Sequence, residues 1–388
     1  MIDFLVGTLV PFLFVLTVLV FVHELGHYLI ARWNGVRVET FSVGFGPELF
    51  GRTDRRGTRW RVSALPLGGY VKMLGGEHSL TGNKDEPLSP EMLAHLDRIG
   101  VSPAQYAFEA FPNKRLAQRA AIVAGGPIAN FLLAAVLFAG LFMFVGEPTT
   151  DPIAGTVQEG SAAAAAGIQP GDRILEVDGD SIATFEELRR VIGLNRGTPI
   201  EILVERDGRQ LLLTATPTLQ RVVDPLGNET TVAQLGITQS VAPVAPLDPL
   251  TAVARGFEET YDLSVMTVQA VAQIVTGTRG TEDVSGVVGI ANLSGQVADL
   301  GIIPLIHFMA ILSISLGLIN LVPIPVLDGG HLLFYAIEAV RGRPLSRRAI
   351  EVAMSFGLVV IVGLFITTTV LDLMRFEGIA AFLNDLTG

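Results

Sequence analysis

The sequence predicts a polytopic α-helical membrane protein with one soluble, β-rich domain, and two observations predict it. First, 49% of the 388 residues are hydrophobic and only 17% are charged, against roughly 25% in an average soluble domain. Second, long stretches without Asp, Glu, Lys or Arg recur, and each can cross a hydrocarbon core of about 30 Å as a helix. One such stretch could be a buried core helix, but four favour a membrane protein. We expect transmembrane helices over residues 4–31, 120–146, 300–327 and 352–371.

The composition also excludes several classes of protein. A formal net charge of -11 provides no positive field for nucleic acid, so no nucleic-acid partner is expected. The chain has no cysteine, which excludes disulfides, thiolate nucleophiles and cysteine-ligated zinc or iron–sulfur sites. Any metal must therefore be held by nitrogen or oxygen ligands.

The charges between the spans predict the orientation in the bilayer. Basic residues outnumber acidic ones in 32–119 and 328–351, and acidic residues outnumber basic ones in 147–299. The positive-inside rule then places residues 32–119 and 328–351 in the cytoplasm and the long acidic loop 147–299 outside. A cleaved signal peptide is the alternative for the N-terminal segment. No basic region precedes Phe4 and no small-residue cleavage site follows the apolar run, so we expect the segment to be retained.

Residues 152–218 carry the signals of a compact β-rich domain. A Pro-Gly turn at 170–171 precedes an alternating strand that ends at Asp178-Gly179, a helical pattern follows, and a hairpin surrounds Asp207-Gly208. This order resembles a bacterial PDZ domain, which captures a peptide or a C-terminus by adding it as an edge strand. A small β domain that only spaces or shields the membrane part is the alternative.

The other regions outside the spans are expected to have simpler roles. In the cytoplasmic loop 32–119, a Gly- and aromatic-rich part predicts β hairpins associated with the membrane, and residues 77–113 predict a mobile or partly helical insertion. The extracytoplasmic linker 219–299 contains an amphipathic pattern that could lie along the membrane or pack on the β-rich domain. Residues 328–351 form a second cytoplasmic loop, and residues 372–388 form a C-terminal tail.

The strongest chemical signal is His23-Glu24-Leu25-Gly26-His27, near the inner end of the first span. Positions i and i+4 share one face of a helix, so two imidazoles can bind one zinc ion while Glu24 handles the proton of a water molecule. Ionisable residues at membrane depth are costly and tend to be functional. The alternative is a pair of histidines that cap a helix at the interface.

A catalytic zinc normally has three protein ligands, so the two histidines require a third. Asp328 follows the third span, and the first and third spans run in the same direction, so all three side chains can lie at similar depth. Pro323 and Pro325 break the helix and a Gly pair follows Asp328, which allows the backbone to turn toward the metal. A helix-terminal or loop aspartate at the interface is the alternative.

Together these motifs resemble the site-2 protease family, in its bacterial regulator-of-sigma-E type. The resemblance rests on H-E-L-G-H, a Gly-Phe-Gly element at 44–46, G-G-P-I-A-N at 125–130, the PDZ-like region, and N-L-x-P-x-P-x-L-D-G-G from residue 320. Well-known members of this type carry two tandem PDZ domains, whereas this chain has the signature of one.

The resemblance implies an intramembrane zinc endopeptidase that cuts single-span membrane proteins within their membrane segment, as the second cut in regulated proteolysis of anti-sigma-factor or signal-peptide-remnant substrates. It implies a bacterial inner membrane, a periplasmic PDZ domain that limits access, and an active site near the cytoplasm. The implied residues are His23, His27 and Asp328 as ligands of Zn2+, Glu24 as general base, Asn320, Gly44, Phe45 and Gly46 in substrate binding, and Asn130 in the second-span motif. Close helix packing by Gly125 and Gly126 is an adequate alternative explanation of that last motif.

Two other functions are open to such a chain. A catalytically inactive membrane adaptor that binds partners through its PDZ domain would need no zinc. A metal transporter would need further acidic or histidine residues along several spans, and only His307 is left over at membrane depth. We expect His78, His95 and His331 to be ordinary surface residues in or near loops.

Overall fold

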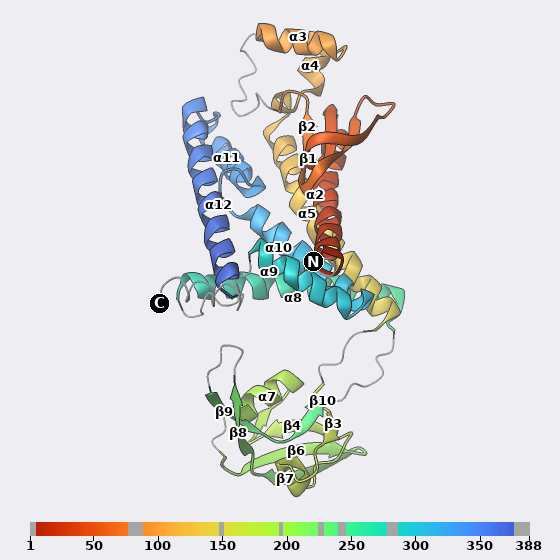
Figure 1. The fold of residues 1–388 in the computed structure, drawn as a ribbon, viewed down its shortest axis with the longest axis vertical. Coiled ribbons are helices and arrows are strands. Elements are labelled where there is room, and N and C mark those ends of the chain that lie inside the picture. Colours follow the sequence, from red (N-terminus) through yellow and green to blue (C-terminus); the bar gives the residue numbers. More distant parts are fainter. Residues whose placement is uncertain are drawn as a thin grey trace. The chain divides into compact units, whose positions relative to one another are not determined.

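The computed structural model describes residues 5–76, 88–146, 151–193, 197–223, 229–239, 246–277 and 286–375 (Figure 1). These residues form two compact units. One unit combines residues 1–141 with residues 248–388, and the other comprises residues 142–247.

Within the described residues, four helices of the first unit are long and apolar enough to cross a membrane. They confirm the expected class, a helical membrane protein with several spans. Helix α10 ends at Leu321 and not at residue 327, because Pro323 and Pro325 have no amide hydrogen to donate to a continuing helix. The four helices are α2 (Val10–Trp33, after the π-helical turn η1, Leu5–Leu9), α5 (Leu116–Phe144), α10 (Ile302–Leu321) and α12 (Arg347–Arg375).

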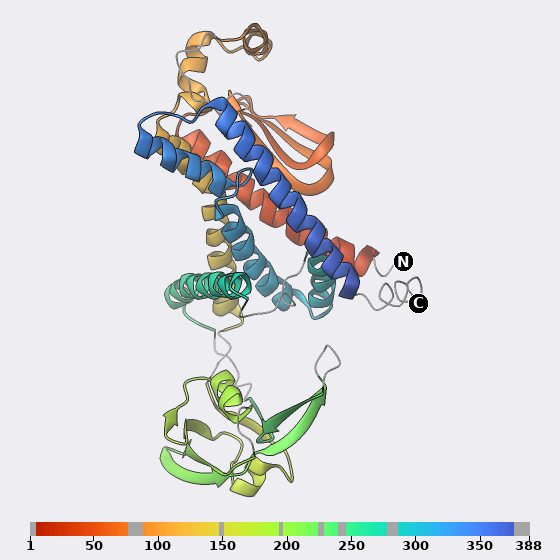
Figure 2. The same cartoon turned by 90° about the vertical axis from the view of Figure 1, so that its left-hand side faces the viewer.

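Two long strands, β1 (Val38–Thr53) and β2 (Arg59–Met73), lie along α2 (Figures 1 and 2). Each strand bends, so that the first half of β1 pairs with both halves of β2. Gly69–Met73 therefore forms an outer edge of the sheet, and no other described strand pairs with its free side. Phe41 of this sheet is buried against α2, where its ring lies edge-on to the Tyr28 ring.

Short helices follow the sheet in the region expected to be mobile or partly helical. Residues 77–87 lie outside the described residues. The remainder forms α3 (Pro90–Arg98), α4 (Pro103–Glu109) and the 3-10 turn η3 (Phe111–Asn113). Ser89 and Ser102 accept hydrogen bonds from the first turns of α3 and α4, and a proline follows each serine as the first helical residue.

The unit of residues 142–247 is built on a four-stranded antiparallel sheet in the order β5-β4-β6-β7. Its core is aliphatic, with Ile174, Leu188, Ile202 and Val204 almost inaccessible. Strand β10 pairs with β3, so this unit extends beyond residue 218, the end expected for the β-rich domain. Its elements are β3 (Ala154–Val157), α6 (Ala162–Ala166), β4 (Arg173–Val177), β5 (Asp180–Ser181), α7 (Phe185–Gly193), β6 (Ile200–Arg206), β7 (Arg209–Ala215), β8 (Thr218–Val223), β9 (Glu229–Gln234) and β10 (Ile237–Gln239).

Three further helices complete the first unit. Helix α8 (Pro249–Val275) corresponds to the amphipathic pattern of the linker, and its Gly256 packs against the α5 backbone. Helix α9 (Val287–Asp299) begins where Asp372 of α12 accepts hydrogen bonds from the amides of Gly286 and Gly289. Helix α11 (Asp328–Arg341) occupies much of the expected cytoplasmic loop 328–351.

Candidate metal centre

Two histidines of α2 point toward one place beside α5. His23 and His27 are one turn apart, and each is only 9% exposed. Gly26, between them, lets the backbone of α5 come close, because a side chain at Gly26 would overlap the main chain of Gly125. The two imidazoles are therefore held between packed helices.

Asp328 reaches the same place from the turn between α10 and α11. Gly329 and Gly330 follow it, and a side chain at either position would overlap the main chain of the preceding turn. Val326 has φ 91, a left-handed conformation that is strained by about 1–3 kcal/mol for a β-branched residue. The compact turn makes Asp328 the first residue of α11, facing the histidines.

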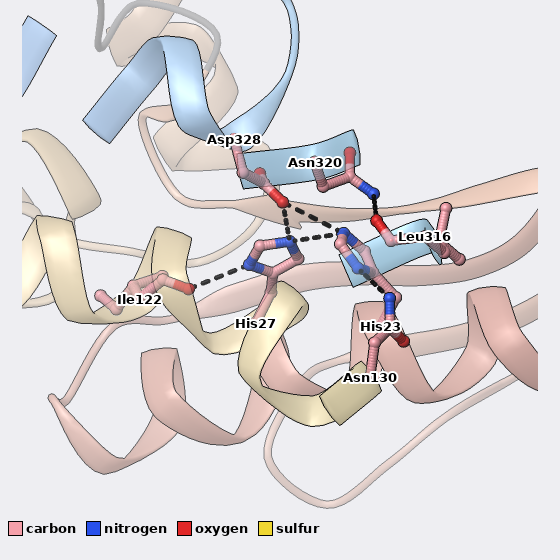
Figure 3. A network of polar contacts seen from close by, with 7 residues as sticks. All are labelled: His23, His27, Ile122, Asn130, Leu316, Asn320 and Asp328. Carbon is pink, nitrogen blue, oxygen red and sulfur yellow. Dashed lines mark hydrogen bonds and ion pairs between the residues drawn. The ribbon is translucent and has the colours of Figure 1, made fainter. Parts of the chain in front are cut away.

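The three side chains converge with the spacing of metal ligands (Figure 3). Asp328 Oδ2 lies 3.2 Å from His23 Nε2 and 3.4 Å from His27 Nε2, and the two Nε2 atoms lie 3.2 Å apart. Bonds of 2.0–2.1 Å in a tetrahedral zinc site place ligand atoms about 3.3–3.4 Å from one another. The triangle matches one face of such a tetrahedron.

The chemistry of the donors also fits a cation. The carbonyl of Ile122 can only accept, so the hydrogen bond of 2.9 Å from His27 Nδ1 puts the proton on Nδ1 and a lone pair on Nε2. Asp328 Oδ2 is buried, and the Nε2 atoms of the two imidazoles lie 3.2 and 3.4 Å from it. Two electron-rich atoms thus face each other, which a divalent cation between them would stabilise. With no cysteine in the chain, the set is nitrogen and oxygen only, as the composition predicts.

Glu24 lies beside the three donors on the wall of a cavity of about 540 Å³. Gly69, at the start of the free edge Gly69–Met73, lies next to the Glu24 side chain. Gly69 approaches closely, since a Cβ there would lie 3.1 Å from Glu24 Cγ. The cavity therefore brings together a carboxylate, an unpaired strand edge and the metal-binding triangle.

Asn320 and Asn130 occupy different positions around this cavity. Asn320 lines it, and its side-chain amide donates to the Leu316 carbonyl at 2.9 Å. Asn130 is fully buried on α5, with Nδ2 at 3.1 Å from His23 Nδ1. The two asparagines thus contact the site from opposite sides (Figure 3).

Gly44, Phe45 and Gly46 are not among the residues that line the cavity. Both glycines have positive φ values of 87°, where β1 bends. The Phe45 ring stacks on that of Tyr70, a cavity residue, with centroids 6.0 Å apart. The Gly-Phe-Gly element therefore lies behind the strand edge and not at the metal-binding triangle.

Two residues of the site, His331 and Ile122, were not predicted from the sequence to have a role there. His331 lies on α11 one turn after Asp328 and lines the cavity, so the expectation of an ordinary surface residue in a loop is wrong. Burial lowers the pKa of its imidazole. The helical spacing of 328 and 331 could have indicated this position, whereas the backbone carbonyl of Ile122 has no sequence signature.

A partly buried ion pair also lines the cavity. Arg119 of α5 donates to Glu338 of α11 at 2.6 Å, and its guanidinium lies 4.9 Å from the centre of the Tyr335 ring. Burial raises the pKa of Tyr335 to about 12, so the phenol remains protonated and uncharged at neutral pH. This cluster ties the helix that carries Asp328 to the helix that contacts both histidines.

The chain matches known proteins along most of its length. The profile of peptidase family M50 matches residues 11–364. Proteins named as zinc metalloproteases are 45% identical in Agrobacterium fabrum, over 97% of this chain and 98% of that protein, and 44% identical in Rhizobium meliloti, over 94% and 96%. Metalloprotease MmpA of Caulobacter vibrioides is 36% identical over 97% of this chain and 98% of its own length.

Among solved structures, the chain is similar to the PDZ domain of an SdrC-like protein from Listeria monocytogenes. The identity is 22%, the match covers 24% of this chain and 90% of that domain, and the TM-score is 0.19. A similarity at this level does not assign the fold of residues 142–247.

Proposed function

This chain belongs to peptidase family M50, the site-2 protease family, and is a membrane zinc metalloprotease. From that premise we propose that it cuts single-span membrane proteins within their membrane segment. The observation that carries the proposal is the triangle of His23, His27 and Asp328, with sides of 3.2–3.4 Å, beside Glu24. Two corners of the triangle, His23 and His27, lie on α2, a helix that is long and apolar enough to span a membrane. This position supports cleavage at membrane depth.

His23, His27 and Asp328 are the proposed zinc ligands. Zinc held there would lower the pKa of a water molecule to about 7 and polarise the scissile carbonyl. Three protein ligands leave one position of a tetrahedron open, as in other catalytic zinc sites. The Ile122 carbonyl holds the His27 ring in the orientation that this requires.

Glu24 is the proposed general base. Its place next to His23 and on the cavity wall allows its carboxylate to take a proton from the attacking water and pass it to the leaving amide nitrogen. The close approach of Gly69 places the Glu24 side chain next to the strand edge.

The substrate is proposed to bind as an extended strand along Gly69–Met73. A helical segment hides its carbonyl groups in its own hydrogen bonds, so it must unwind before hydrolysis, and the free edge supplies replacement partners. Asn320 lies on the cavity wall where its amide can hold the opposite side of that strand. Gly44, Phe45 and Gly46 support the edge from behind, through the Phe45–Tyr70 stack.

Residues 142–247 are proposed to contain a PDZ domain that regulates access and does no chemistry. In the proposed orientation this unit lies on the periplasmic side of a bacterial inner membrane, and the zinc site lies near the cytoplasm. The domain would reject substrates with bulky external parts until a first protease has shortened them. Replacing residues 152–239 by a flexible linker should then increase cleavage of the uncut substrate, while unchanged discrimination would contradict this role.

The direct test of the proposed function combines metal analysis with a cleavage assay in detergent. The purified chain should contain about one zinc ion and cut peptides from a panel of single-span segments, preferring those with helix-weakening residues. Glu24→Gln should keep its zinc and lose cleavage by about 10²–10⁴-fold, because only the proton transfer is removed. A zinc chelator should abolish the activity.

Cleavage that survives in Glu24→Gln would remove the assignment of the base. Zinc-free protein with full cleavage would remove the assignment of the metal. Peptide binding by residues 142–247 without cleavage of any membrane segment would favour the alternative, a membrane adaptor.

A further inference from the structure

The helix α5 contacts the Nδ1 atom of both proposed histidine ligands. The Ile122 carbonyl accepts from His27 Nδ1 at 2.9 Å, and the Asn130 side chain lies 3.1 Å from His23 Nδ1. Helices α2 and α5 run in opposite directions, so the earlier histidine meets the later residue of α5 (Figure 3). One helix thus controls which nitrogen of each imidazole carries the proton.

The two contacts differ in chemistry. A carbonyl only accepts, so Ile122 allows a single tautomer of His27. A side-chain amide can donate through Nδ2 or accept through Oδ1, so Asn130 can satisfy either tautomer of His23. In the structure Nδ2 faces the ring, and with this orientation a neutral His23 would carry its proton on Nε2, the atom that faces Asp328 and His27.

A proton on Nε2 is incompatible with metal binding by that atom. Rotation of the amide by about 180° would bring Oδ1 to His23 Nδ1, move the proton to Nδ1 and free the Nε2 lone pair. Asn130 Oδ1 is buried and has no hydrogen-bond partner among the described residues, which costs about 1–3 kcal/mol in the present orientation. The rotation would give this oxygen a donor.

The surroundings hold Asn130 firmly enough for this role. Its residue is fully buried, and Ser313 of α10 donates to its backbone carbonyl at 2.8 Å. The buried amide lies 3.1 Å from His23 Nδ1, so rotation about its terminal bond exchanges Nδ2 and Oδ1 at the ring.

We propose that Asn130 is a positioning residue that selects the zinc-binding tautomer of His23 by accepting a hydrogen bond from Nδ1 through its amide oxygen. The inference rests on the proposed zinc site, but it assigns a role to a residue that is not itself a ligand. An acceptor at this position is what zinc binding requires, so a carboxylate should replace the amide and an apolar side chain should not.

Zinc affinity, measured on the full chain in detergent by competition with a chromophoric chelator, tests the role without any cleavage assay. Asn130→Leu is close in volume and should bind zinc about 10–100-fold more weakly, the usual loss for a partner that orients a histidine ligand. Asn130→Asp should bind zinc at least as tightly as the wild type. Ser313→Ala removes the neighbouring contact but keeps the amide, and should change the affinity by less than about threefold.

Nitrogen-15 NMR of histidine-labelled, zinc-free protein gives a second readout, which a merely structural role would not move. His23 should carry its proton on Nδ1 in the wild type and in Asn130→Asp. Unchanged zinc affinity in Asn130→Leu, an Asn130→Asp variant as weak as Asn130→Leu, or a zinc-free wild-type His23 protonated on Nε2 would each overturn the proposal. Failure of the protease assay alone would leave these zinc and NMR results unaffected, so the two proposals fail separately.

Discussion

The zinc-site region and the unit of residues 142–247 differ in the kind of residues that they bury. In the smaller unit, an aliphatic core of residues such as Ile174, Ile202 and Val204 forms from strands that are near neighbours along the chain. In the larger unit, polar groups from α2, α5 and the start of α11 meet between apolar helices. The triangle of His23, His27 and Asp328 joins the start of the chain to its last quarter.

The buried residues of the smaller unit therefore mainly stabilise its fold, whereas the buried polar residues of the larger unit are placed to bind a metal. The smaller unit owes its order to the hydrophobic effect and tolerates exchange of its surface residues. The metal centre depends on sub-ångström placement, which is obtained by removing side chains at Gly26, Gly125 and Gly126 so that two helices and two rings can meet. Substitutions in one region should therefore leave the other unchanged.

The largest effect is expected from Asp328→Asn. An amide binds zinc far less well than a carboxylate, so the variant should lose most of its zinc and all measurable cleavage. Metal analysis of the purified protein and a cleavage assay check this. Asp299→Asn, which changes an exposed acid at the end of α9, is the matched control and should keep both zinc and cleavage. Full zinc content in Asp328→Asn would exclude Asp328 as a ligand.

A somewhat smaller effect is expected from Gly126→Ala. A Cβ at this position would overlap the His27 ring and lie 2.8 Å from His23 Cε1, so both imidazoles must move. Zinc affinity should fall by about tenfold or more. Gly140→Ala on the same helix gives the same gain in helix propensity with open space around the new methyl group, and should leave the affinity unchanged. Equal affinities in the two variants would show that the rings are not held by this contact.

In the other region, Ile202→Ala should lower the stability of residues 142–247 by about 2–5 kcal/mol, because it leaves a cavity in the aliphatic core. Hydrogen exchange of β4, β6 and β7 measures this. The zinc content should not change. Leu212→Ala, at a position that is 63% exposed on the neighbouring strand, should have almost no effect on either quantity. Loss of zinc in Ile202→Ala would show that the two regions are coupled.

The smallest effect concerns pH and the buried Asp172. Burial alone would raise its pKa, but the Arg206 guanidinium, with contacts of 2.7 and 2.6 Å, outweighs burial and holds the pKa below its ordinary value. The pair therefore stabilises the fold above the unfolded-state pKa of about 3.9, and this contribution disappears as pH falls through the folded-state value. The difference in hydrogen-exchange protection between wild type and Arg206→Met should be full near neutral pH and vanish in strong acid. A difference that grows on acidification would contradict the sign.

Much of the site follows from local patterns in the sequence. The i, i+4 spacing of His23 and His27 places both rings on one helix face, and the direction of the spans brings Asp328 to the same depth. The class of protein, zinc metalloprotease of the site-2 family, was predicted from the resemblance of the motifs to that family and is confirmed by the comparisons. The four apolar helices needed only composition and length.

The remaining features depend on tertiary contacts that no local pattern encodes. The free edge at Gly69–Met73 arises because β1 and β2 both bend and pair twice, so the Gly-Phe-Gly element that resembles a family motif ends up behind the edge. The role of Asn130 requires its distance to His23, and the loop expected after residue 328 is a helix that places His331 on the cavity wall. Each of these depends on which segment packs against which.

Zinc-edge X-ray absorption spectroscopy of the loaded protein tests the metal centre most directly. It should show a shell of two imidazole nitrogens with oxygen neighbours at about 2.0–2.1 Å and no sulfur. In His23→Ala the imidazole signal of any remaining zinc should fall by one ring. A shell without imidazole, or one that is identical in wild type and His23→Ala, would contradict the assignment of this site.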